Sequence, residues 1–166
     1  MCFSQQASGI KTSDEVTTIY NEMRLVKNDA NQLERIRIVV FEIKDSQIQP
    51  TKTFRQKDLT DVENVYKVFL EQMPSGECCY LLYDCHFETK DSPKEELVLV
   101  MWTPDTSKCK DKMVYASSKQ YIRKAMPGIK HEMEFNDASD YEIETFADKL
   151  GKNISKIEGH SFGGRK

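Results

Sequence analysis

The stretch that decides the fold covers residues 97–132 and reads LVLVMWTPDTSKCKDKMVYASSKQYIRKAMPGIKHE. Its apolar start, Leu97–Trp102, predicts a buried strand. A Thr-Pro-Asp turn follows, and a helical pattern then runs to Met126, where a Pro-Gly pair ends it. Beyond that pair, residues 131–135 alternate between apolar and polar and predict a half-buried strand. Because a helix joins the two strands, we expect them to be parallel.

The predicted helix has two unlike faces. At helical spacing, the arc expected to face the core comprises Val114, Tyr115, Ser118, Tyr121, Ile122, Ala125 and Met126. The opposite, softer face comprises Cys109, Met113, Ala116, Ser117, Gln120 and Lys124, with cations on its flanks. A solvated face normally carries long charged side chains, whereas small residues and Met suit close contact with another surface. This face is therefore either a surface that enters a partner's apolar cleft or the exposed side of an ordinary amphipathic helix.

The remaining periodicity predicts a single α/β domain. Further helices are expected near 13–27, 60–73 and 139–150. Thr12 or Ser13 is expected to cap the first, and the capping boxes Thr12-x-x-Glu15, Thr60-x-x-Glu63 and Ser139-x-x-Glu142 indicate where the three begin. Further strands are expected at 35–43, 47–54 and 78–87, the last forming an antiparallel hairpin with 96–102. Pro50 marks an edge strand or a bulge. The sum is a mixed sheet of about five strands sandwiched between helices.

Composition narrows the class of protein. A chain of 166 residues suits one domain with a real core. The net charge of −3 argues against nucleic acid as the main partner. No apolar run approaches the roughly 20 residues of a membrane span, and the first residues contain no secretory signal. Five cysteines without CxxC spacing imply neither a zinc site nor a disulfide framework, which suits the reducing cytosol.

The sequence shows no catalytic constellation. Its three histidines lie in no metal-ligand motif, and GxSxG, P-loop and GxGxxG patterns are absent. Asp84 lies inside the apolar run YLLYDCHF, so it is either hydrogen-bonded within the structure or functional. We therefore expect no enzymatic activity, no cofactor and no metal.

Several motifs together resemble one known family. The segments KMVYASSK (112–119) and GIKHE (128–132) closely resemble the signature of the actin-depolymerising factor/cofilin family. The segments ASGI (7–10), FETK (87–90) and ADKLG (147–151) resemble its amino terminus, central hairpin and last helix. The resemblance covers residues 7–159. Residues 1–6 then form a flexible extension and residues 160–166 a disordered tail.

The resemblance implies the actin-depolymerising-factor homology fold, with no catalysis. Members bind actin monomers and filaments and promote severing and depolymerisation. The monomer-binding residues would be Ser8, Gly9, Ile10, Lys110, Lys112, Met113, Ser117 and Ser118, although Ser118 also falls on the apolar arc. The filament-specific surface would include Lys90 and Lys94. The alternatives are a relative that binds actin-related complexes or filaments without severing, and a phosphoinositide-binding membrane-surface module.

The resemblance also implies three regulatory inputs. Ser8 matches the serine whose phosphorylation inactivates the family. Phosphoinositide headgroups would bind Lys110, Lys112, Lys119, Arg123 and Lys124, unless these cations form only a solvated basic edge. His131 matches a pH-sensing histidine whose acidic neighbour is expected to be Glu96, the alternative being a structural histidine. We expect a monomeric, cytoplasmic protein associated with the actin cytoskeleton. Residues 32–37 lack the family's lysine-rich import run, which argues against active nuclear import.

Overall fold

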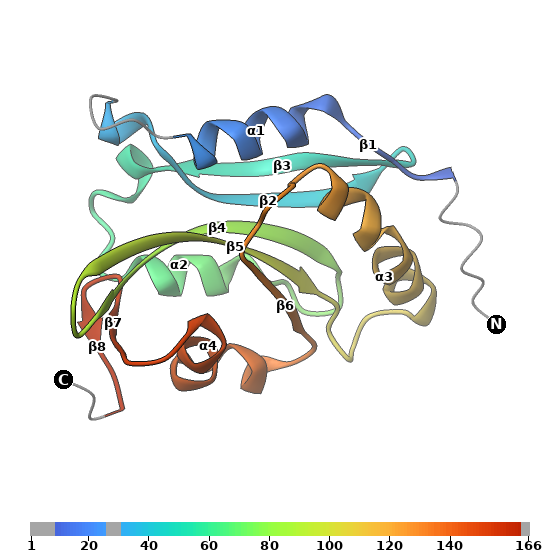
Figure 1. The fold of residues 1–166 in the computed structure, drawn as a ribbon. Coiled ribbons are helices and arrows are strands. Elements are labelled where there is room, and N and C mark those ends of the chain that lie inside the picture. Colours follow the sequence, from blue (N-terminus) through green and yellow to red (C-terminus); the bar gives the residue numbers. More distant parts are fainter. Residues whose placement is uncertain (1–8, 26–30, 164–166) are drawn as a thin grey trace.

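The fold is seen in a computed structural model that describes residues 9–25 and 31–163. Its mixed sheet has the order β1-β3-β2-β4-β5-β6, with β7 on β4 and β8 on β7. The strands are β1 (Lys11–Thr12), β2 (Ile36–Lys44), β3 (Gln47–Arg55), β4 (Cys79–Thr89), β5 (Pro93–Trp102), β6 (His131–Phe135), β7 (Ile154–Ile157) and β8 (His160–Ser161). The helices are α1 (Asp14–Arg24), α2 (Val65–Glu71), α3 (Cys109–Lys124) and α4 (Ile143–Leu150). Helices α1 and α3 cover one face of the sheet, and α2 and α4 cover the other (Figure 1).

Strand β2 explains why the protein has three layers. Successive side chains of a strand point to opposite faces of the sheet. Ile38 and Val40 accordingly pack in the core beneath α2 and α4, whereas Val39 and Phe41 pack in the core beneath α1 and α3. A strand that is apolar at consecutive positions can be buried only between two helical layers. The expected sandwich is thus confirmed.

The strand pairing also confirms the predicted connections. Strands β4 and β5 form an antiparallel hairpin that runs from Cys79↔Trp102 to Glu88↔Pro93. Strands β5 and β6 are parallel, as expected for two strands joined through α3. Pro50 lies beside a register shift between β2 and β3, so the predicted bulge is confirmed.

The sheet extends beyond the about five strands that the periodicity predicts, because β1, β7 and β8 are too short to show a period. The tail predicted as disordered begins with β8, and Phe162 packs against the core beneath α2 and α4. The extension 1–6 and the predicted end of the first helix, Lys27, lie outside the described residues.

Two of the three predicted helix starts are wrong. Helix α1 begins after Ser13, one of its two expected caps, although the Ser13 side chain makes no capping bond. Helix α2 starts after Asn64, whose side chain accepts a hydrogen bond from the Tyr66 amide. Before α4, Asp137 accepts from the Ser139 amide and caps a 3-10 turn at Ala138–Tyr141. Asn and Asp are strong caps, and these two cap the local turns in place of the Thr and Ser residues of the predicted boxes.

Four aromatic rings form the centre of the core beneath α2 and α4. The Phe69 ring stacks on the Tyr83 ring with centroids 4.3 Å apart and an interplanar angle of 16°. Tyr66 and Phe146 tilt against Phe69 at centroid distances of 5.8 and 5.9 Å. Phe69 therefore joins α2, α4 and β4.

We expect Phe69→Ala to lower the free energy of unfolding by about 3–5 kcal/mol, because it removes a fully buried ring and leaves a cavity. Urea denaturation measures this change. The control is Leu33→Ala at an exposed leucine, which should change stability by no more than about 0.5 kcal/mol. Equal effects of the two substitutions would contradict this account of the core.

Candidate functional site: the outward face of α3

The inner face of α3 is anchored to the sheet by two tyrosines. Tyr115, Ser118 and Ile122 are buried, which confirms the arc expected to face the core. The Tyr80 hydroxyl donates to the Tyr115 carbonyl, and the Tyr115 hydroxyl accepts from the Ile43 amide at 2.9 Å. The orientation of α3 about its own axis is therefore fixed.

The opposite face of α3 is open. Ala116, Gln120 and Lys124 are exposed, and Met113 and Ser117 are half-buried. The Ser117 hydroxyl donates to the Met113 carbonyl at 2.8 Å, so it occupies a backbone acceptor of its own helix. The residues Met113, Ala116, Ser117, Gln120 and Lys124 thus form an outward strip with little charge, as their composition predicts. We call this surface the α3 strip.

Strand β1, near the described start of the chain, lies beside α3 (Figure 1). Its course is fixed by the Lys11 amide, which donates to the Ser46 carbonyl at 3.0 Å. Ile10 packs against the core shared by α1 and α3, and Gly9 is exposed. The structure thus brings the predicted residues Gly9 and Ile10 to the same end of the molecule as Met113. Ser8 lies outside the described residues.

One predicted contact residue is in the wrong place. Ser118 is fully buried with 0% exposure, and its hydroxyl has no hydrogen-bond partner in the described structure. A side chain on the inner face of α3 cannot touch a molecule that docks on the outer face. We therefore exclude Ser118 from the candidate site, since its position on the apolar arc outweighs the motif match.

The cations of α3 differ in whether they are already bound to other groups of the protein. Lys119 is 14% exposed and pairs with Glu134 at 2.8 Å. Arg123 pairs with Glu132 at 2.7 Å. Lys112 donates to the Asp105 carbonyl at 3.1 Å. Within the described ranges, the remaining two, Lys110 and Lys124, are exposed and have no ion-pair partner. The basic edge is thus partly neutralised by β6.

The predicted histidine–acid pair is present. His131 Nε2 lies 2.8 Å from Glu96 Oε1, and Lys130 Nζ lies 2.6 Å from Glu96 Oε2. Burial alone would raise the pKa of Glu96, but the hydrogen bonds from Lys130 and His131 outweigh burial and hold that pKa below its ordinary value. The pair therefore joins β5 to the start of β6.

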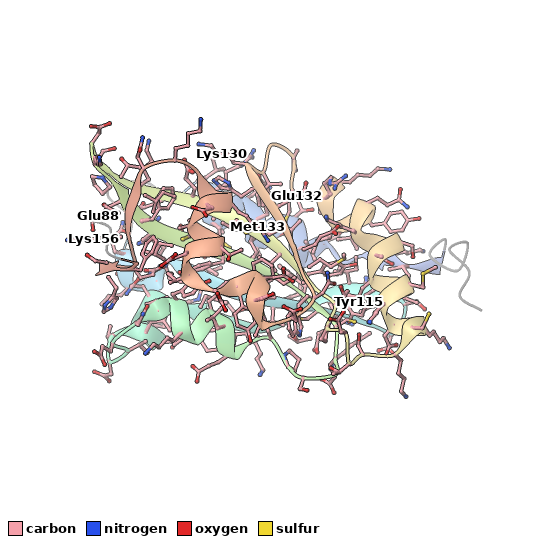
Figure 2. The ribbon with its side chains drawn as sticks, turned by 90° about the horizontal axis from the view of Figure 1, so that it is seen from below. Glu88, Tyr115, Lys130, Glu132, Met133 and Lys156 are labelled. Atoms are coloured by element: carbon pink, nitrogen blue, oxygen red, sulfur yellow. The ribbon has the colours of Figure 1, made fainter. Side chains whose placement is uncertain are left out.

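Lys90 is exposed in the turn between β4 and β5, and Lys94 is exposed at the start of β5. Both figures place this turn at the opposite end of the molecule from α3, and in Figure 2 Glu88 and Tyr115 mark the two ends. The Thr89 hydroxyl shapes the turn by accepting from the amides of Asp91 and Ser92, each at 3.3 Å. The predicted residues therefore form two separate surfaces.

Asp84, which the sequence leaves as structural or functional, has structural partners. Its carboxylate accepts from Arg35 Nε at 3.0 Å and lies 4.0 Å from Arg37 Nε. Arg37 pairs in turn with Glu158. Sequence reasoning missed Arg37 and Glu158, although an arginine inside the apolar run 35–43 is a signal that a buried partner exists.

In residues 9–25 and 31–163, no group of three or more His, Cys, Asp or Glu side chains could hold a metal ion. Over the same residues, no helix is long and apolar enough to cross a bilayer.

Comparison with known proteins gives a consistent result. The sequence model of the cofilin/tropomyosin-type actin-binding proteins matches residues 9–151. Cofilin of Streptomyces griseoflavus is 29% identical with a TM-score of 0.70, and the match covers 86% of this chain and 99% of that chain. Two more distant structures share the fold. Actin depolymerization factor 2 of Plasmodium berghei is 23% identical with a TM-score of 0.71, covering 85% of this chain and 96% of its own. The human coactosin-like protein is 15% identical with a TM-score of 0.64, covering 95% of each chain.

The lowered pKa of Glu96 predicts a pH-dependent contribution to stability. A carboxyl with a lowered pKa stabilises the folded state fully above its ordinary value of 4.5 and loses that contribution as the pH falls through the folded-state pKa. We expect the difference in unfolding free energy between the natural protein and Glu96→Gln to be largest above pH 4.5 and to shrink on further acidification. Urea titrations at several pH values measure it. A difference that is independent of pH would contradict the role of the charge.

Proposed function

This chain belongs to the family of cofilin/tropomyosin-type actin-binding proteins, and we propose that it binds actin monomers and filaments and promotes filament severing and depolymerisation. The observation that carries the proposal is the soft outward strip of α3. Helix α3 contacts β1, and its inner face is fixed by Tyr80 and Tyr115. A preformed, low-charge ridge suits insertion into an apolar cleft.

Two surfaces at opposite ends suit a filament, in which one molecule can touch two subunits. We propose that the α3 strip, with Lys110, Lys112, Met113 and Ser117, contacts one subunit, and that Lys90 and Lys94 contact its neighbour. A protein that binds one filament conformation more tightly shifts the filament toward that conformation. Severing then follows at the boundary between altered and unaltered subunits, where contacts fit poorly.

The function is tested by co-sedimentation with actin filaments together with imaging of filament length. Co-sedimentation with shorter filaments supports the proposal. Co-sedimentation with unchanged filament length would instead identify a relative that binds without severing. Absence of binding to both monomers and filaments would contradict the proposal and leave the lipid-binding module as the better candidate.

We further propose that phosphorylation of Ser8 weakens actin binding. A phosphate adds about −1.5 to −2 charges. Ile10 follows two residues later and packs in the core shared with α3, so we propose that this charge acts on docking at α3. The pair of His131 and Glu96, whose side chains lie 2.8 Å apart, is proposed to couple activity to pH. We also propose that the protein is monomeric and that it acts in the cytoplasm, at the actin cytoskeleton.

We expect the double variant Lys112→Ala/Met113→Ala to abolish measurable binding to actin monomers, because it removes the centre of the docking strip. Neither side chain is fully buried, so the unfolding temperature should change little. The matched control is Lys67→Ala, which removes an exposed lysine from α2 on the other side of the sheet. Monomer binding is measured by fluorescence titration of labelled actin. Normal binding by the double variant would exclude α3 as the docking site.

Phosphoinositide binding to α3 is proposed to depend on the cations that have no ion-pair partner. We expect Lys110→Ala/Lys124→Ala to weaken binding to vesicles that contain phosphoinositides, with each lysine near the surface contributing about 1 kcal/mol. Lys119→Ala should weaken it less, because Glu134 and Glu132 already neutralise Lys119. Vesicle sedimentation measures both variants. A larger loss for Lys119→Ala would show that the ion pairs to β6 open on the membrane.

A further inference from the structure

Glu158 adopts an unusual backbone conformation for its residue type. It lies in the turn between β7 and β8 with φ of 50°, followed by Gly159 with φ of 82°. A non-glycine residue with positive φ is uncommon, and such paired turns favour Asn, Asp or Gly at the first position. A glutamate in this position loses local stability unless its side chain restores it.

The Glu158 side chain has partners on two other strands. It is 5% exposed and accepts two hydrogen bonds from Arg37 Nη2 at 2.7 and 2.6 Å. It also accepts from the Tyr83 hydroxyl and, at 3.3 Å, from the His86 amide. Burial, the largest cause, raises the pKa of Tyr83, so the phenol stays protonated and remains a donor. Glu158 therefore ties the carboxy-terminal hairpin to β2 and β4.

These contacts lie at the root of the turn that carries Lys90. Strand β7 pairs with the end of β4 through Phe87↔Ile157, Glu88↔Lys156 and Thr89↔Ile154, and Figure 2 shows Glu88 and Lys156 side by side. The Glu158 amide donates to the His86 carbonyl at 2.7 Å. Lys94 lines the same cavity of about 610 Å³ as Arg37, His86 and Glu158. The end of β4 is thus held by β5 on one side and by the Glu158 turn on the other.

We propose that Glu158 is a positioning residue for the filament-contacting turn: by pairing with Arg37 and Tyr83 it fixes the end of β4, and with it Lys90 and Lys94. The inference rests on the proposed function, since it assumes that these two lysines contact the filament. It predicts that a change at Glu158 weakens binding to filaments and leaves binding to monomers unchanged. The α3 strip lies at the other end of the sheet, so monomer binding does not depend on Glu158.

The test compares Glu158→Gln with the control Glu71→Gln, which changes an exposed glutamate of α2 that forms no ion pair in the described ranges. We expect Glu158→Gln to raise the Kd for filaments about tenfold, the scale of one lost charge-assisted contact. The Kd for monomers should stay within about twofold, as should both constants of the control. An equal loss of monomer and filament binding would show a merely structural role, and no loss would refute the inference.

Two further variants keep the test decisive. The double variant Lys90→Ala/Lys94→Ala tests whether these two lysines contact the filament. Normal filament binding by that variant would reject the proposed filament surface itself. If this double variant binds filaments weakly while folded Glu158→Gln binds normally, only the inference about Glu158 fails.

Glu158→Gln leaves Arg37 buried without the carboxylate of Glu158 and could fail to fold for that reason. In that case Tyr83→Phe is the variant to use, because it removes one hydrogen bond to Glu158 and no charge. The amides of residues 89–92 should then exchange with solvent faster than in the natural protein, and unchanged exchange would refute the inference.

Discussion

The structure depends on the burial of β4 and β5 on both faces. Alternate residues of these strands enter two separate cores, so helices must cover both sides of the sheet. This constraint decides which face of α3 is buried and which is open. The helix must give one face to the sheet, where Tyr115 and Ile122 are buried, and its other face is left to solvent or to a partner. The docking strip is therefore a geometric consequence of the layered fold, with its chemistry supplied by Met113, Ala116 and Ser117.

The same sheet also separates the two proposed surfaces. The hairpin of β4 and β5 extends away from α3, so that the turn of the hairpin and α3 lie at opposite ends (Figure 1). Buried charge accumulates at the hairpin end, where Arg37, Asp84 and Glu158 lie close together. Breaking one buried pair leaves an uncompensated charge, which is costly. The hairpin end is thus held by buried charged contacts, whereas the inner face of α3 is held by apolar packing and two tyrosine hydroxyls, with ion pairs to β6 along its edge.

Much of this could be predicted from the sequence. The apolar run in β2, the hairpin of β4 and β5, the crossover through α3 and the inner face of α3 all follow from period and length. The starts of α2 and α4 could not be predicted, because Asn64 and Asp137 form caps that the Ser/Thr boxes obscured. Short strands such as β7 have no readable period. Ser118 shows the limit of motif matching, since a residue within a matched motif lies on the buried face. The pairing of Arg37 with Glu158 joins positions far apart in the chain, which no local pattern reveals.

We propose that actin docks on the outward face of α3. The most direct measurement is methyl NMR of the protein with and without actin monomers. If actin docks there, the methyl signals of Met113 and Ala116 shift or broaden when actin is added. Those of Met73 and Ala138, on the side of α2 and α4, do not change. Perturbation of Met73 and Ala138 with unchanged Met113 and Ala116 would contradict the proposal.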